Sequence, residues 1–266
     1  MLIASFFCNF AYVLETREKK MKSIKSYIPN TLTCCNFLCG CIAVYLTLLF
    51  HGEPTYLIYA FCLIILGALF DFCDGMSARL LGVSSGIGKE LDSLADATTF
   101  GLAPTTMLFI FTYNHIGWAA LISLLMAAFS ILRLAKFNLD TRQTTSFIGL
   151  ATPANALFWA PLICILSSLD INPAWSWVLL GFSLISCFLL VSEIPFFSLK
   201  FHDLKWENNK IRYIFIGCAV LTALCAIIIG AFKEILITAL LCAVVTIILI
   251  YIILALIDNI INAKRQ

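Results

Sequence analysis

Long apolar runs alternate with short polar breaks along the chain, at a spacing that predicts membrane-crossing helices. Eight such runs are expected, at about 31–50, 55–73, 90–113, 116–136, 151–169, 173–195, 211–231 and 234–258. About 20 helical residues cover the roughly 30 Å of a bilayer core, so each run can span it. The runs are continuous rather than alternating, which argues against a membrane β-barrel. The predicted fold class is all-α, a polytopic membrane helix bundle of about eight transmembrane helices.

The composition supports a single membrane domain. Of 266 residues, 62% are apolar and 12% are charged, and the mean hydropathy is +1.00. A soluble domain is nearer half apolar and a quarter charged. The 12 cysteines lie mostly inside apolar runs and form no CxxC pair. They are interpreted as small helix residues, with a disulfide or metal framework as the alternative.

The positive charges predict how the bundle is oriented. With the eight predicted spans, sixteen of the seventeen Lys and Arg residues fall on one side of the membrane, and only Lys233 falls on the other. The positive-inside rule makes the richer side cytoplasmic. We therefore expect an integral protein of the cell (inner) membrane with both termini in the cytoplasm. An odd number of spans would destroy this separation of charge.

One short stretch concentrates charge in this apolar chain: "DFCDGMSARLLGVSSGIGKELDSLAD", from Asp71 to Asp96. Asp71 and Asp74 are three residues apart, and Asp92 and Asp96 are four apart, so each pair shares a helix face. The glycines and serines between the pairs permit a sharp reversal. Four carboxylates are therefore expected to converge from two neighbouring helices at the cytoplasmic surface.

Converging carboxylates repel one another unless a cation lies between them. Surface loop acids are the alternative, which fits Glu90 but not Asp92 and Asp96, because acids inside a span are costly and usually functional. An all-oxygen site suits Mg²⁺, Mn²⁺ or Ca²⁺ rather than Zn²⁺. Such ions hold phosphates, and two together can clamp a displacement at phosphorus. A cation transporter is the rival function, but it predicts a second acidic motif and broken helices at mid-membrane depth.

The spacing of these residues resembles a family signature. The pattern Asp71-x2-Asp74-Gly75-x2-Ala78-Arg79-x8-Gly88-x3-Asp92-x3-Asp96 is similar, at every fixed position, to the signature of the CDP-alcohol phosphatidyltransferases. The resemblance implies a family core of six helices over residues 27–204, which leaves two additional helices and a short cytoplasmic tail at 205–266. Residues 1–26 are then a cytoplasmic segment, either interfacial or an extension upstream of a start at Met21.

The family transfers a phosphatidyl group from a CDP-linked lipid to an alcohol and releases CMP. By this likeness Asp71, Asp74 and Asp92 bind a pair of divalent ions, Mg²⁺ or Mn²⁺. Asp96 also lies at the metals and is the expected general base. Nucleotide or CDP-lipid contacts are implied for Gly75, Ala78, Arg79 and Gly88.

The first span begins with a motif that bears on the nucleotide and on the acceptor. In "YIPNTLTCCNFLCGCIAV", Asn30 and Thr33 are candidates for hydrogen bonds to the nucleotide. The alternative is that Asn30 or Thr31 caps the start of a helix. Asn36 stands where the glycerol phosphate and cardiolipin branches usually carry an arginine, which favours the serine branch.

Two later stretches also resemble the serine branch, "SILRLAKFNLD" (130–140) and "FIGLATPANA" (147–156). Lys136 and Ala151 depart from that branch's usual arginine and proline. Arg133 is a candidate for binding the serine carboxylate through two parallel hydrogen bonds, with a positive-inside anchor as the alternative. Lys136 and Asn138 complete the predicted acceptor residues, Asn138 as a reader of the amino group.

The predicted function is a CDP-diacylglycerol–serine O-phosphatidyltransferase reaction that yields phosphatidylserine and CMP. The alternatives are the same reaction with glycerol 3-phosphate or inositol phosphate, and a cation transporter. The expected partners are CDP-diacylglycerol, L-serine and membrane lipid, with no nucleic acid. The resemblance also suggests a homodimer.

Overall fold

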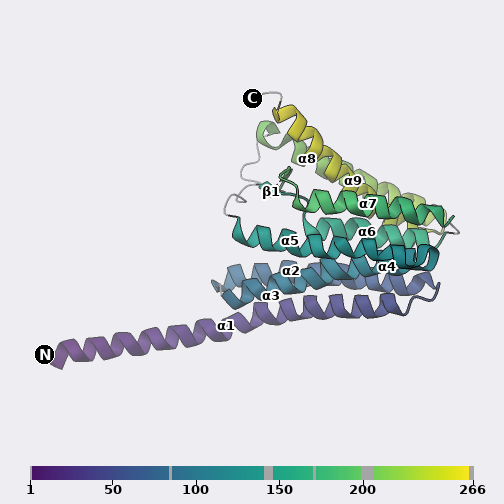
Figure 1. Ribbon diagram of the computed structural model, residues 1–266. Helices are drawn as coiled ribbons and strands as arrows, with labels where there is room; N and C mark the ends of the chain where they lie inside the picture. Colours follow the sequence, from purple (N-terminus) through teal and green to yellow (C-terminus); the bar gives the residue numbers. More distant parts are fainter. Residues whose placement is uncertain (1, 84–85, 141–145, 170–171, 199–205, 264–266) are drawn as a thin grey trace.

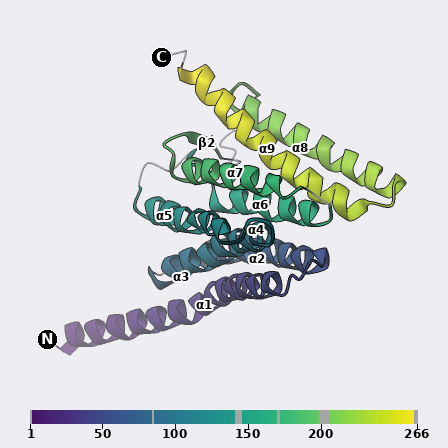
Figure 2. The ribbon, with the colours of Figure 1, turned by 45° about the vertical axis from the view of Figure 1, so that its right-hand side comes forward.

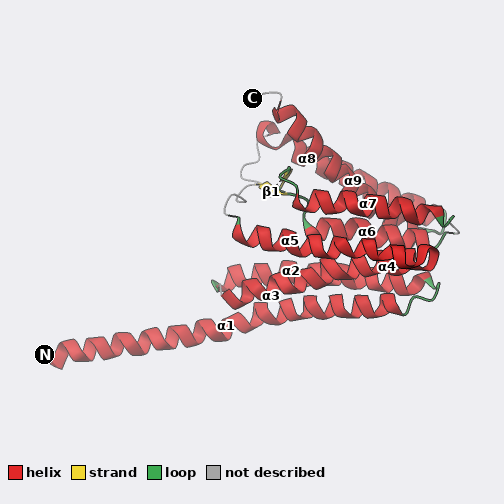
Figure 3. Ribbon diagram, in the orientation of Figure 1, coloured by secondary structure: helices red, strands yellow, loops and turns green. Residues whose placement is uncertain are grey.

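The structure is a computed structural model that describes residues 2–83, 86–140, 146–169, 172–198 and 206–263. Nearly all of these residues are helical (Figure 3). The helices are α1 (Leu2–Leu48), α2 (Pro54–Leu81), α3 (Gly86–Asp96), the π-helix η1 (Ala97–Leu102), α4 (Ala103–Ile116), the 3₁₀-helix η2 (Gly117–Leu124), α5 (Leu125–Leu139), α6 (Thr152–Ser167), α7 (Ala174–Val191), α8 (Trp206–Phe232) and α9 (Leu236–Ala263). Two short strands, β1 (Ser146–Ile148) and β2 (Pro195–Phe197), pair antiparallel.

Six helical segments are long and apolar enough to cross a membrane: Lys25–Leu48, Pro54–Leu81, Gly86–Leu139, Ala174–Val191, Asn209–Phe232 and Leu236–Ile261. The segment Gly86–Leu139 contains two rods that meet at Gly117, where φ is +58°. The rods fold back on each other, because η2 packs on α4 and α5 packs on η1 (Figure 1). α6 is apolar but has only 16 residues. The chain is thus an all-α, polytopic integral membrane protein, and the count of eight crossings stays a prediction.

The first helix differs from its prediction. α1 runs without a break from Leu2 to Leu48 and passes through Pro29, and its N-terminal half extends beyond the bundle (Figure 1). Proline removes a backbone donor inside a helix, and two threonine hydroxyls bond nearby carbonyls, Thr31 to Tyr27 and Thr33 to Pro29. The alternative that Asn30 or Thr31 caps a helix start is therefore wrong.

The turn after α2 places the acidic stretch at one end of the bundle. The Gly82 backbone is left-handed at φ +62°, a conformation that glycine adopts without steric cost. Its N–H donates to the Arg79 carbonyl, and the Val83 N–H donates to the Ala78 carbonyl. These two bonds form a Schellman motif, which ends the helix and reverses the chain. α3 therefore starts beside the end of α2 (Figure 1).

The main core lies between the helices of the first two thirds of the chain, with Leu57, Phe100, Met107 and Trp159 fully buried in it. α8 and α9 pack against each other on the side away from α1 (Figure 2). α9 also packs on α6 and β2 through a second cluster that includes Phe196 and Tyr251. The eleven cysteines whose side chains the structure describes are all free.

Candidate active site

Three carboxylates, two from α2 and one from α3, meet beside α1. One oxygen from each of Asp71, Asp74 and Asp92 lies within 4.8 Å of the others. Asp74 is buried, and Asp71 and Asp92 are half-buried. Two ionised carboxylates at this separation repel by roughly 3 to 4 kcal/mol at an effective dielectric constant of about 20. Among the described residues no lysine or arginine pairs with the three, so their charge needs another counter-ion.

The donor set fits a hard divalent cation. All three groups offer oxygen ligands, as Mg²⁺, Mn²⁺ and Ca²⁺ prefer. The Oδ1 atom of Asp92 is buried and has no hydrogen-bond partner among the described residues, although buried polar oxygens are nearly always satisfied. A cation between the three carboxylates would satisfy this atom and remove the repulsion.

α1 closes the third side of the acidic site. The Thr33 hydroxyl donates to Oδ2 of Asp74 at 2.6 Å, which is shorter than its 3.0 Å contact with the Pro29 carbonyl oxygen. A hydroxyl has one proton to donate, so the shorter contact to the carboxylate is the stronger bond. Thr33 of α1 thus holds Asp74, a candidate metal ligand on α2. This contact differs from the nucleotide contact that the sequence predicted for Thr33.

Asp96 lies one turn beyond Asp92 along α3, outside the group of three carboxylates. Its Oδ1 accepts a hydrogen bond of 3.2 Å from Nδ2 of Asn36 on α1. The backbone carbonyl of Asn36 accepts a second bond of 2.9 Å from the Thr99 hydroxyl. The π-helix η1 begins at the residue after Asp96, and single π-helical turns are frequent at functional sites.

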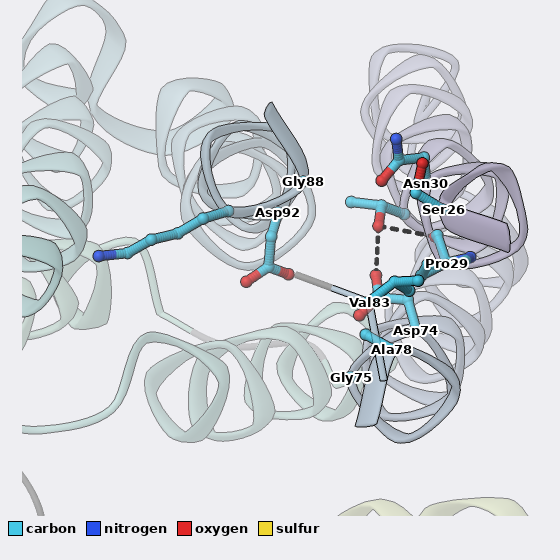
Figure 4. A pocket seen from close by; sticks show the side chains of 11 residues that line it. Ser26, Pro29, Asn30, Asp74, Gly75, Ala78, Val83, Gly88 and Asp92 are labelled. Carbon is cyan, nitrogen blue, oxygen red and sulfur yellow. Dashed lines mark hydrogen bonds between the residues drawn. The ribbon is translucent and has the colours of Figure 1, made fainter. Parts of the chain in front are cut away.

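A cavity of about 250 Å³ opens beside the acids between α1, α2 and α3. Figure 4 shows Asp92 of α3 facing Asp74 of α2, with Pro29 and Asn30 of α1 on the third side. Five of the six residues predicted for nucleotide or CDP-lipid contacts line it: Asn30, Thr33, Gly75, Ala78 and Gly88. The sixth, Arg79, is exposed and does not line the cavity. No atom would contact a Cβ at Gly75 within 4 Å, so this wall is open to a bound group.

Arg133 lines a second cavity, of about 300 Å³, between the ends of α5 and α7. Its side chain is only 7% exposed, and its Nε has no partner among the described residues. Nη1 lies 3.5 Å from the Thr152 hydroxyl, and the guanidinium lies over the Phe137 ring at 5.2 Å. Lys136, Asp140 and Glu193 line the same cavity. Arg133 and Lys136 thus line one cavity, and their role in acceptor binding stays a prediction.

Asn138 lies elsewhere. Its Nδ2 donates to the Ser93 hydroxyl at 2.7 Å, and its backbone carbonyl accepts from Nζ of Lys89 at 2.9 Å. These bonds link the end of α5 to α3. Asn138 is not among the residues that line the cavity beside Arg133, so its predicted contact with the amino group has no support from this geometry and stays a prediction.

Sequence reasoning gave no site role to three buried polar residues, Asn36, Thr99 and Asn155. Asn36 was used only to separate the branches of the family. Thr99 and Asn155 lie inside apolar runs, and the whole Asn155 amide is buried without a partner among the described residues. A polar side chain in a predicted span, which is costly there, was the available signal.

The part of the chain that holds this site is similar to known proteins. The family model for CDP-alcohol phosphatidyltransferase matches residues 26–192. A CDP-diacylglycerol–serine O-phosphatidyltransferase of Bacillus subtilis (strain 168) is 35% identical over 181 residues, which cover 66% of this chain and 93% of that protein. A protein of the same name from Methanocaldococcus jannaschii is 32% identical over 193 residues, 71% of this chain and 84% of its own.

A third relative with this name, from Helicobacter pylori (strain J99), is 31% identical over 189 residues, 67% of this chain and 74% of its own length. The matched region includes both acidic helices and the described lining of the cavity beside Arg133 except Glu193. It also contains the motif from Asp71 to Asp96 on which the resemblance rested. The chain therefore belongs to the CDP-alcohol phosphatidyltransferase family.

Proposed function

We propose that this membrane enzyme transfers the phosphatidyl group of CDP-diacylglycerol to the hydroxyl of L-serine, which gives phosphatidylserine and CMP. The observation that carries the proposal is the convergence of Asp71, Asp74 and Asp92 beside one cavity, with Asp96 one turn away. The names of the relatives point to the same reaction. Family membership argues against the cation transporter.

The cavity between α1, α2 and α3 is the proposed site of the CDP headgroup. Asp71, Asp74 and Asp92, with Asp96, would hold one or two Mg²⁺ or Mn²⁺ ions, which supply positive charge to the diphosphate when bound. Gly75, Ala78 and Gly88 leave room for the nucleotide, and Asn30 offers an amide for hydrogen bonds to it. Arg79, exposed beyond Ala78, is a proposed contact for phosphate.

The reaction exchanges one bond at phosphorus. The serine hydroxyl oxygen forms a bond to the phosphorus of the phosphatidyl group, and the bridging bond from that phosphorus to the CMP phosphate breaks. The bonding electron pair leaves with CMP. Asp96 is the proposed general base that takes the hydroxyl proton, a role usually worth 10²- to 10⁴-fold in rate.

The cavity beside Arg133 is the proposed site of the acceptor. Its described lining carries two cations, Arg133 and Lys136, and two acids, Asp140 and Glu193. A lining with both signs of charge suits a zwitterion, whose carboxylate pairs with Arg133 and whose ammonium faces the acids. The names of the relatives favour serine over glycerol 3-phosphate or inositol phosphate as the acceptor.

The proposed orientation puts this site on the cytoplasmic side of the cell membrane. The N-terminal half of α1, the end of α2, the start of α3 and the end of α5 all lie at one end of the bundle (Figure 1). These segments carry most of the Lys and Arg residues, whereas Lys233 lies in the α8–α9 turn at the other end. The positive-inside rule then gives the orientation. The homodimer stays a prediction from the resemblance.

CMP release from CDP-diacylglycerol by the purified protein in detergent tests the proposal. L-serine, glycerol 3-phosphate and inositol 1-phosphate are offered separately, with Mn²⁺ or Mg²⁺ and with a chelator. We expect release that requires both serine and metal. Release with another acceptor would keep the aspartates and overturn the assignment of the cavity beside Arg133. No release with any acceptor, from protein shown to be folded, would overturn the reaction.

A further inference from the structure

A buried amide on α1 contacts the proposed general base. Asn36 is fully buried, and its Nδ2 donates to Oδ1 of Asp96 at 3.2 Å. If the amide nitrogen and oxygen of Asn36 were exchanged, the oxygen would face the Asp96 carboxylate. An ionised carboxylate accepts hydrogen bonds and cannot donate one. The nitrogen therefore faces Asp96. The bond engages one carboxylate oxygen and leaves Oδ2 to receive a proton.

Asn36 lies where η1 approaches α1 and α2 unusually closely. The Thr99 hydroxyl donates to the backbone carbonyl of Asn36 at 2.9 Å. A Cβ at Gly40 would lie 2.5 to 2.9 Å from three atoms of Thr99, and a Cβ at Gly67 would lie 2.8 Å from Oδ1 of Asn36. Only glycine allows backbones to approach this closely. Thr99 is therefore packed closely against Gly40 of α1, and the Asn36 side chain is packed closely against Gly67 of α2.

We propose that Asn36 is a positioning residue for Asp96. Its amide fixes the rotation of the carboxylate so that Oδ2 faces the acceptor hydroxyl. Thr99, held between Gly40 and Gly67, bonds the backbone of Asn36 and so fixes the point from which its side chain reaches Asp96, and the π-helical turn after Asp96 sets the register of Thr99. This role rests on the proposed function, because it concerns the base of that reaction.

A purely structural hydrogen bond makes a different prediction. Loss of such a bond would lower the thermal stability and leave the turnover of the folded enzyme intact. Loss of a positioning bond lowers kcat, because a misplacement of about 1 Å can cost about 10²-fold in rate. Binding of CDP-diacylglycerol would be preserved, since Asn36 does not line that cavity.

The test uses four full-length variants: Asn36→Leu, Thr99→Val, Thr99→Ser and Thr47→Val. Asn36→Leu removes the donor at similar volume, and Thr99→Val removes only a hydroxyl, whereas Thr99→Ser retains it. Thr47→Val is the matched control, because Thr47 is fully buried on the same helix and bonds only its own helix, at the Ala43 carbonyl. CMP release gives kcat and both KM values. Thermal stabilisation by CDP-diacylglycerol with Mn²⁺ reports donor binding.

We expect Asn36→Leu to lower kcat about 100-fold and Thr99→Val about tenfold, with unchanged stabilisation by CDP-diacylglycerol. Thr99→Ser should restore most of the kcat lost in Thr99→Val, and Thr47→Val should match the wild type. A kcat within about threefold of wild type for folded Asn36→Leu would overturn the role. If that variant does not fold, an undiminished kcat in Thr99→Val would overturn it. A wild type that releases no CMP would overturn the proposed function and this role together.

Discussion

The acidic site and the cavity beside Arg133 are built in different ways, although they lie in one bundle. The four aspartates come from consecutive helices joined by one tight turn, between Asp71 and Asp96. The lining of the second cavity comes from α5, β1, the end of α7 and Glu193. The chemistry thus depends on a local arrangement, whereas recognition of the acceptor depends on how distant segments assemble.

The two regions are also held by different helices. Thr33 and Asn36 of α1 bond the carboxylates directly. On the other side, Tyr251 and Asn259 of α9 donate to the carbonyls of Phe197 and Pro195 in β2, which pairs with β1. β1 leads to α6 and Thr152, the neighbour of Arg133. α9 thus supports the acceptor side of the bundle.

The largest expected effect is on the acidic site. Asp92→Asn removes one of three converging carboxylates and should lower CMP release by at least about 10³-fold, because metal charge is worth several kcal/mol to such a transition state. Stabilisation of the protein by Mn²⁺ in a thermal melt should also be lost. Glu90→Gln, an exposed acid on the same helix, is the control and should behave as wild type. Retained metal stabilisation in Asp92→Asn would contradict the metal assignment.

Asp96→Asn should lower kcat by about 10² to 10⁴-fold, because it removes the proposed base. CDP-diacylglycerol should still bind, since Asp96 lies outside the group of three carboxylates. Thermal stabilisation by the lipid substrate measures this binding. Full residual turnover would refute the base role, and loss of lipid binding would show that Asp96 mainly holds metal.

Arg133→Ala should raise the KM for serine about 10- to 100-fold, because a hydrogen bond between charged groups is worth about 1.5 to 3 kcal/mol. Binding of CDP-diacylglycerol should change little. Arg133→Lys should be intermediate, since lysine keeps the charge and loses the planar fork. An unchanged KM for serine in Arg133→Ala would remove the acceptor site from this cavity.

The smallest effect is expected from the support that α9 gives to β2. Tyr251→Phe combined with Asn259→Ala removes the two hydrogen bonds from α9 to β2, each worth about 1 kcal/mol. The KM for serine should rise a few-fold and the melting temperature should fall slightly, while the KM for CDP-diacylglycerol stays constant. Thr246→Val is the control, because Thr246 is exposed on the same helix and, among the described residues, its hydroxyl bonds only the Cys242 carbonyl. Equal changes in both KM values would mean that α9 supports the whole bundle.

Sequence reasoning predicted the helical rods well, because a run of apolar residues fixes both the length and the surroundings of a membrane helix. The turn after Leu81 was also predictable, since Gly82 permits a left-handed end to α2. The start of α1 was not predicted correctly. The first span was expected to begin near residue 31, whereas the helix continues through Pro29 toward the N-terminus, and membrane helices tolerate proline.

The candidate site, like the fold, could be predicted from the sequence only in part. The sequence determined the pairing of acids on two helix faces, because residues three or four apart always share a face. Only the tertiary structure decided that Asn36 and Thr33 bond those acids, that Arg133 and Lys136 share a cavity with Asp140 and Glu193, and that Asn138 bonds Ser93 instead. Contacts between helices depend on which faces pack together, and the spacing of residues along one helix does not carry that information.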